Sequence, residues 1–275
     1  AFNTIFEYGL FSESTFRLSS RNYIRALTSV TSGDGDVPMQ NDFGGLKYGF
    51  RIDYLPNGLF TRYGQFRQSD LVRERIPKLV FGIRGSFNQG ISSRRGRTQG
   101  DILYLDKDFL PLLPNYWQMG ADFLFKFQGL SVLGEFVSSD ASVPENIDYR
   151  VRNDGSISSS FLIDGNQNIE SYVKNRMMIG NGYNLQAGYV LKNGISLDLR
   201  YCYLQAPEYS FLNNPTFYSR PEAISIGLSK YFSRWYGFKM QSSVTRFSVD
   251  GANSMNGEPL TKPEWLVQFI TSVLI

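Results

Sequence analysis

The sequence predicts an all-β protein, an antiparallel transmembrane β-barrel of about twelve strands within a range of about ten to sixteen. Three observations predict it. Apolar and polar residues alternate in segments of about ten, short and long connections follow one another, and 15% of the residues are aromatic. Because successive side chains point to opposite faces of a strand, this alternation gives each segment one apolar and one polar face. No linker or change in composition divides the 275 residues, so we expect a single domain over residues 1–275.

The clearest hairpin covers residues 117–136. Every second residue from Trp117 to Phe127 is apolar, and after a turn at Gln128-Gly129 the apolar face resumes at Leu130 and continues to Phe136. Similar alternation predicts strands at 46–54, 78–87, 183–191, 195–203, 223–232, 238–248 and 264–275. Weaker patterns predict three more strands, at 2–10, 21–31 and 59–66.

The connections predict a direction for the barrel. If the last strand runs inward, the tight turns at 128–129, 192–194 and 233–237 are periplasmic. The long segments then become external loops: 88–116, 139–182, 205–221 and 249–263. Short periplasmic turns and long external loops are typical of outer-membrane barrels.

Two points of this topology stay open in the sequence. The same count places the turn at 56–58 outside and 67–77 inside, unless residues 59–66 are not a strand. The loop 139–182 either folds into the lumen or projects as a docking surface.

The three tryptophans agree with a membrane barrel. Trp117 and Trp265 fall at the outer starts of inward strands, and Trp235 falls in a periplasmic turn. Amphipathic rings favour such membrane–water boundaries. The alternative is a soluble β-sandwich, in which connections are more even in length.

The composition excludes several classes of function. The chain has no histidine, which removes Ser-His-Asp triads, Cys-His pairs and histidine zinc sites, and its one cysteine, Cys202, removes an intrachain disulfide framework. Gly33-Asp34-Gly35-Asp36 lacks the spacing and closing Glu of a calcium loop. A net charge of +3 gives no argument for nucleic acid. We therefore expect no metal, no cofactor and no enzyme, with a carboxylate-pair glycosidase as the open exception.

With the apolar face toward lipid, charged residues of the other face would line the lumen. These residues are Lys47, Arg51, Asp53, Arg84, Asp122, Lys126, Glu135, Asp198, Arg200, Lys230, Lys239 and Glu264. Charges inside a pore tune which ions enter. The alternative is that they pair across the lumen and fill it.

Two clusters lie in connections. Arg94, Arg95 and Arg97 fall in the external loop that follows Asn88, where guanidiniums bind carboxylate or phosphate. They would draw anions to a pore mouth or contact lipopolysaccharide phosphates, or they form only a solvated basic loop. The charged residues of 67–75 alternate in sign, which indicates local ion pairs.

Five segments resemble the phosphate-selective porin family of Gram-negative outer membranes. They are RIDYLP (51–56), SDLVRERIPKLVFG (69–82), SRRGR (93–97), ADFLFKFQGLSVLGEF (121–136) and GYNLQAGY (182–189), in matching order over most of 43–275. The resemblance implies an outer-membrane barrel with passive diffusion that favours anions. Members of the family usually have about sixteen strands and more chain before this region. This chain also ends at Ile275 in place of an aromatic residue, and its lumen arginines do not match the family's, so phosphate selectivity is not carried over.

These observations lead to one hypothesis and one alternative. The hypothesis is a porin-like channel of the bacterial outer membrane for passive diffusion of small solutes, with a preference for anions. The alternative is a non-conducting structural subunit of a larger outer-membrane complex. Expected partners are outer-membrane lipid and lipopolysaccharide, together with further copies of the chain or other outer-membrane proteins.

Overall fold

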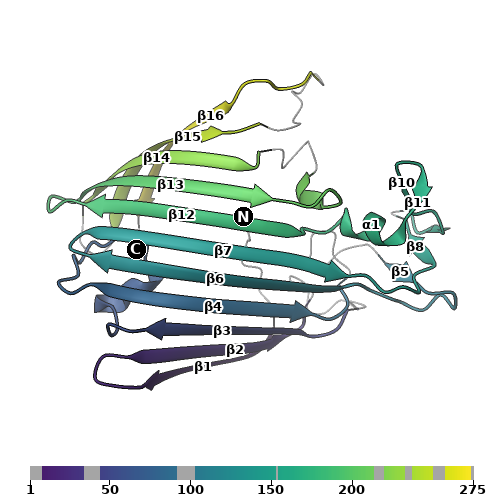
Figure 1. The fold of residues 1–275 in the computed structure, drawn as a ribbon, viewed down its shortest axis with the longest axis horizontal. Helices are drawn as coiled ribbons and strands as arrows, with labels where there is room; N and C mark the ends of the chain where they lie inside the picture. The colour runs from purple at the N-terminus through teal and green to yellow at the C-terminus, as the bar shows by residue number, and fades with distance from the viewer. Residues whose placement is uncertain are drawn as a thin grey trace.

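The structure is a computed structural model that describes residues 8–33, 44–91, 103–152, 154–213, 220–232, 237–249 and 258–273. Over these residues eleven long strands form one antiparallel sheet, and each pairs with the next long strand in the chain (Figure 1). The long strands are β1 (Gly9–Arg17), β2 (Tyr23–Thr31), β3 (Lys47–Leu55), β4 (Lys78–Asn88), β6 (Asn115–Phe127), β7 (Leu130–Ser142), β12 (Gly180–Val190), β13 (Ile195–Gln205), β14 (Glu222–Tyr231), β15 (Phe238–Phe247) and β16 (Glu264–Val273). The predicted all-β antiparallel class is confirmed.

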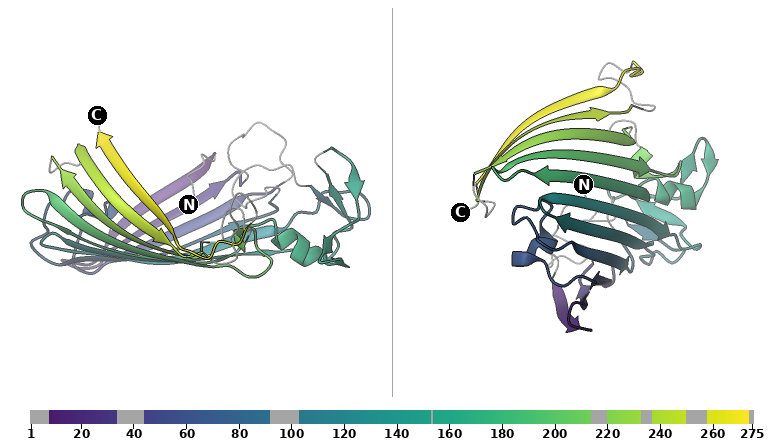
Figure 2. Two further views of the ribbon diagram at one scale, coloured as in Figure 1. Left: turned by 90° about the horizontal axis from the view of Figure 1, so that it is seen from above. Right: turned by 60° about the vertical axis from the view of Figure 1, so that its left-hand side comes forward.

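The sheet curves into an open trough (Figure 2). Within the described residues, β1 pairs only with β2 and β16 pairs only with β15, so the sheet has two free edges. Closure into a barrel therefore stays a prediction. Of the strand expected at 2–10, residues 2–7 lie outside the described part of the chain, and β1 covers Gly9–Arg17, so that strand continues beyond the expected end.

Short and long connections lie at opposite ends of the sheet. Tight connections at 18–22, 128–129 and 191–194 lie at one end, where β14 also ends and β15 begins, and we call it the short-turn end. Connections at 32–46, 89–114, 143–179, 206–221 and 248–263 lie at the other, the long-loop end. This matches the alternation expected from the sequence, while the compartment that each end faces stays a prediction.

The predicted strand at 59–66 is wrong. Residues Thr61–Phe66 form a 3-10 segment, η1, in which Arg62 and Tyr63 have φ values of 55° and 57°. Two consecutive left-handed residues cannot continue an extended strand. The whole segment 56–77, which we call the inner segment, is one connection from β3 to β4 at the short-turn end. The turn at 56–58 and residues 67–77 therefore share one end of the sheet.

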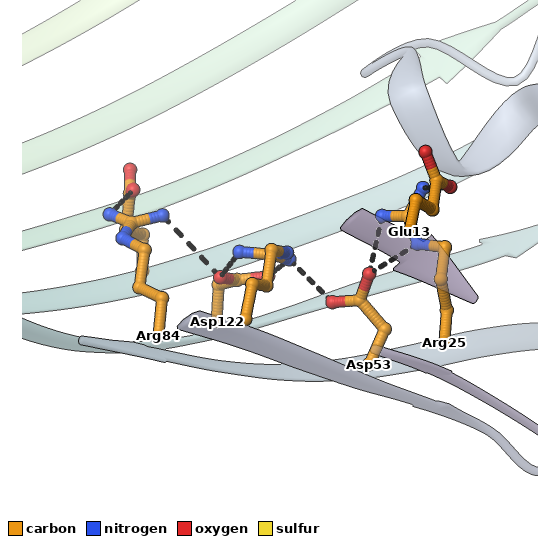
Figure 3. Close-up of polar contacts among 7 residues, drawn as sticks. Glu13, Arg25, Asp53, Arg84 and Asp122 are labelled. Atoms are coloured by element: carbon orange, nitrogen blue, oxygen red, sulfur yellow. Dashed lines mark hydrogen bonds and ion pairs between the residues drawn. The ribbon is translucent and has the colours of Figure 1, made fainter. Parts of the chain in front are cut away.

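The two faces of the sheet differ in chemistry. On the outer, convex face, aligned apolar side chains continue across strands, as where Ile83 pairs with both Ile52 and Ala121. Many of these side chains are exposed, including Leu199 at 52% and Ile226 at 57%. The inner, concave face carries the charged and small polar residues (Figure 3). Because side chains alternate along a strand, the register fixes both faces at once.

The long-loop end carries a small subdomain that we call the cap, residues 103–113 and 143–179. It contains β5 (Tyr104–Leu105), β8 (Tyr149–Val151), β9 (Ile157–Ser158), β10 (Leu162–Ile163), β11 (Asn166–Gln167) and α1 (Ile169–Lys174). A further 3-10 turn, η2 (Phe211–Asn213), lies in the next loop. The cap projects beyond the ends of β6, β7 and β12 (Figure 1), so the loop 139–182 projects rather than folding into the trough.

The cap has its own apolar core. Phe161 and Val173 are fully buried, and Ile147 and Tyr172 pack in the same cluster. Asn168 caps α1 by accepting a hydrogen bond from Ser171 N at 2.9 Å. No helix in the described ranges is long and apolar enough to cross a membrane.

Within α1, the ammonium of Lys174 lies 2.8 Å from a Glu170 carboxylate oxygen, one turn earlier. This hydrogen bond raises the pKa of Lys174. The pair is solvent-exposed and contributes little to stability.

We expect Phe161→Ala to destabilise the cap by about 3 kcal/mol, because it leaves a cavity in a core with no exposed surface. Hydrogen exchange should show faster exchange of cap amides, with β12 to β14 still protected. Leu162→Ala is the matched control, since Leu162 is 54% exposed. Equal loss of protection in cap and sheet would contradict a separate cap core.

Candidate functional site

The inner face holds eleven of the twelve residues expected to line a pore. Eight of them are Lys47, Arg51, Arg84, Asp122, Lys126, Glu135, Asp198 and Arg200. Asp53, Lys239 and Glu264 share this face by register. Lys230 does not, because it pairs with Ile195 and lies two residues from Leu228 on the outer face. Its assignment to the lumen was wrong.

Seven charged side chains form a continuous row across this face (Figure 3). In order along the row they are Glu13, Arg25, Asp53, Arg51, Asp122, Arg84 and Glu135. At its first end, Arg25 Nη1 lies 3.6 Å from Glu13, and Arg25 Nε donates to Asp53 at 2.9 Å. Arg51 Nη2 lies 2.8 Å from the second Asp53 oxygen. Asp53 is only 1% exposed and is held between two guanidiniums.

The rest of the row continues into β6, β4 and β7. Arg51 binds both oxygens of Asp122 at 2.7 Å, a two-pronged geometry that is among the strongest ion pairs. Arg84 lies 3.5 Å from the same carboxylate and also donates to Glu135. Opposite charges alternate along the whole row.

The pairing limits what the row can do. It contains three guanidiniums and four carboxylates, so Arg51 and Arg84 do not present a positive surface by themselves. Arg51 also lies between the carboxylates of Asp53 and Asp122, which therefore do not face each other across an open gap. The row therefore fits the alternative that charged residues of the inner face pair with one another.

Glycines of the inner face leave room for the side chains of the charge row. A Cβ at Gly82 would lie 2.4 Å from Arg51 Nη2 and 2.8 Å from oxygens of both Asp53 and Asp122. A Cβ at Gly120 would lie 3.0 Å from Arg84 Nε. The long side chains can lie flat against the sheet because these neighbours have none.

Lys126 serves a different purpose from the one predicted. It is 1% exposed, and its ammonium donates to the carbonyls of Gly64 and Ser69, each at 2.9 Å. It thereby ties the inner segment to the inner face. A buried ammonium needs such partners, because an unpaired one would be very costly.

Two buried carboxylates complete this attachment. Asp70 accepts hydrogen bonds from Glu74 N and from Gly129 N, the latter at 2.7 Å across the β6–β7 turn. Glu74 accepts from Thr61 N at 2.6 Å and from the Thr61 hydroxyl at 2.9 Å. The contacts of Glu74 are therefore these hydrogen bonds with Thr61, whereas the sequence indicated local ion pairs among 67–75.

The inner segment reaches across several strands. Phe60 packs with Leu55, Val80 and Leu124 near β3 to β6. Farther along, the Ser69 hydroxyl lies 2.8 Å from the hydroxyl of Tyr231 on β14. The segment thus spans the inner face at the short-turn end.

The other predicted residues lie away from the row. Asp198 accepts hydrogen bonds from Ser196 at 3.0 Å and Ser229 at 3.3 Å. Arg200 Nε donates to Asn184 at 3.0 Å. Lys47 lines an inner-face hollow of about 470 Å³ together with Arg84.

Some predicted residues lie outside the described part of the chain. They are Arg94, Arg95, Arg97 and Trp235, as well as Asp34 to Asp36 of the calcium-like fragment. Conversely, the row contains Glu13 and Arg25, which the pattern did not single out because Glu13 lies beyond the expected strand 2–10 and the strand at 21–31 alternates weakly. The charged positions within 9–17 and 23–31 were the available signal.

A scan against protein-family models and searches of curated proteins and of solved structures each found no match.

We expect Gly82→Ala to destabilise the protein by about 2 kcal/mol, because the new methyl group would displace Arg51 and its two carboxylates. The measurement is the urea unfolding midpoint. Gly182→Ala is the matched control, since Gly182 also lies on the inner face and a Cβ there meets nothing within 4 Å. Equal effects of the two substitutions would show that the row does not require this space.

Proposed function

We propose that this chain forms the wall of a porin-like channel in the bacterial outer membrane, through which small hydrophilic solutes diffuse passively. The observation that carries the proposal is the contrast between the two faces of one large antiparallel sheet. Its outer face exposes apolar side chains on strand after strand, while its inner face is lined by ions, hydroxyls and glycines. An exposed apolar surface of this kind marks contact with a membrane or another protein.

The apolar surface fits lipid through its aromatic residues. Tyr48, Phe87 and Trp117 form one cross-strand row near the long-loop end of the outer face. Aromatic girdles at the membrane–water interface are typical of transmembrane barrels. This aromatic row supports a lipid bilayer as the environment of the outer face.

Membrane insertion would require the two free edges to be paired. A bilayer offers no hydrogen bonds to backbone N–H and C=O groups, so only closed sheets span it. With eleven antiparallel strands, an odd number, β1 and β16 run in the same direction. Direct closure would make a parallel pair, and closure by antiparallel pairing would need an odd number of added strands.

The proposed solutes are small and polar. Whether the channel prefers anions depends on which cations are available to attract them. The charge row is internally paired, and Lys47 and Arg200 are two predicted inner-face cations that do not belong to it. Besides these two residues, Arg94, Arg95 and Arg97 of the predicted external loop are the cations that we propose attract anions.

Planar-bilayer recording of the purified protein should show discrete conductance steps, with reversal potentials under a salt gradient that indicate anion preference. Replacing Arg94, Arg95 and Arg97 together with Gln should weaken that preference without changing step frequency, since we propose that they attract anions at the pore mouth and that the strands form the wall. Unchanged selectivity would remove their role. A folded protein that never conducts would reject the channel.

A charge on the outer face distinguishes a membrane sheet from a soluble one. In a bilayer, Leu199→Lys at the middle of β13 should cost about 2–4 kcal/mol, whereas at an exposed site of a soluble protein the cost is about 0.5 kcal/mol or less. The measurement is urea unfolding from phospholipid vesicles. Ser243→Lys, on the inner face in the middle of β15, is the control and should be nearly neutral. Equal small effects would reject a lipid-facing outer surface.

The second candidate is a non-conducting structural subunit of an outer-membrane assembly. It is favoured by the inner segment, which crosses the inner face, and by the cap, which projects as a folded subdomain at the long-loop end. A silent protein that co-purifies with other envelope proteins would support it.

A further inference from the structure

A hollow of about 650 Å³ lies at the short-turn end of the trough, outside the charge row. It is enclosed by the inner segment on one side and by the β12–β13 turn and the end of β14 on the other. Its size is within the usual range for sites that bind small molecules.

The charged residues that line this hollow are all basic. They are Arg62 and Arg73 of the inner segment and Lys192 of the turn, and no described lining residue is acidic. The nearby carboxylates of Asp70 and Glu74 are buried. Asp70 accepts hydrogen bonds from Gly129 N and Glu74 N, and Glu74 accepts hydrogen bonds from Thr61. The charged side chains that an occupant of the hollow would meet are therefore the three cations, while Asp70 and Glu74 are buried beside it and do not line it.

The backbone holds two of these cations in an unusual conformation. Arg62 and Arg73 have φ values of 55° and 51°, a region that glycine or asparagine adopts far more readily. Arg73 also donates to the carbonyl of Val190, which fixes its guanidinium at the edge of the hollow. Non-glycine residues in this region concentrate at binding and catalytic sites.

The remaining wall combines the polar residues Thr61 and Asn193 with a group of apolar side chains. Leu71, Val190 and Tyr231 pack together in one buried cluster, and Phe232 lines the hollow beside them. An occupant would therefore meet cations at one side and aliphatic and aromatic surface at the other.

We propose that this hollow binds a small organic anion that has one carboxylate and an apolar body. The carboxylate would lie between Arg62 and Lys192, because guanidinium and ammonium groups form strong charge-assisted hydrogen bonds with it. The apolar body would cover Leu71, Val190 and Phe232. The site does not depend on conduction, since it is built from the inner segment, the β12–β13 turn and the ends of β12 and β14.

The test is isothermal titration of the full chain, in a non-ionic detergent, with 4-phenylbutanoate and with its uncharged amide. We expect the carboxylate to bind at least about tenfold more tightly than the amide, because only it forms charged hydrogen bonds. Sodium chloride should weaken the carboxylate's binding. Equal binding of the two probes, or no binding of either, would overturn the proposal.

Substitutions locate the site. Arg62→Gly suits the left-handed backbone, so we expect it to keep or raise the unfolding temperature while it weakens carboxylate binding about tenfold. Lys192→Gln should weaken binding to a similar degree. The control is Arg21→Gln, which removes a cation from the β1–β2 turn at the same end of the sheet but outside the hollow. Wild-type affinity in both Arg62→Gly and Lys192→Gln, or an equal loss in Arg21→Gln, would overturn the assignment.

Discussion

The register of the antiparallel strands is the constraint on which the rest of this structure depends. A slip of one residue between neighbouring strands would exchange the two faces of the displaced strand. In the observed register, Ile83 pairs with Ile52 and Ala121 on the outer face. The same pairing brings Arg51 of β3 within 2.7 Å of Asp122 of β6, across β4. Apolar alignment on one side and ion pairing on the other therefore support the same arrangement.

The charge row shows how buried charges are accommodated on the polar inner face. Asp53 is almost fully buried, yet each of its oxygens has a guanidinium partner. Removing a guanidinium beside Asp53 would leave one oxygen of a buried carboxylate without its ion-pair partner, which is far more costly than the net gain in stability from the pair. Gly82 and Gly120 belong to this arrangement because their missing side chains allow the arginines to lie against the sheet.

The two ends of the trough carry different additions. At the long-loop end, the cap has a core of its own around Phe161 and Val173. At the short-turn end, the inner segment depends on the sheet, since Lys126 and Gly129 supply hydrogen-bond donors to it. The cap is therefore a folded unit that extends beyond the sheet, whereas the inner segment is held against the inner face by the strands that it crosses.

The sequence by itself determined the strand periodicity, the polar and apolar faces, and the order of short and long connections, because each depends on neighbours in the chain. It did not determine the partners of Arg51 or Lys126, which come from residues about sixty to seventy positions away and require the register. It misassigned 59–66 because its apolar spacing resembles a strand, while packing of Phe60 and the left-handed Arg62 and Tyr63 turn the chain inward. Tertiary structure decided these features because burial and ion pairing outweigh local extended preference.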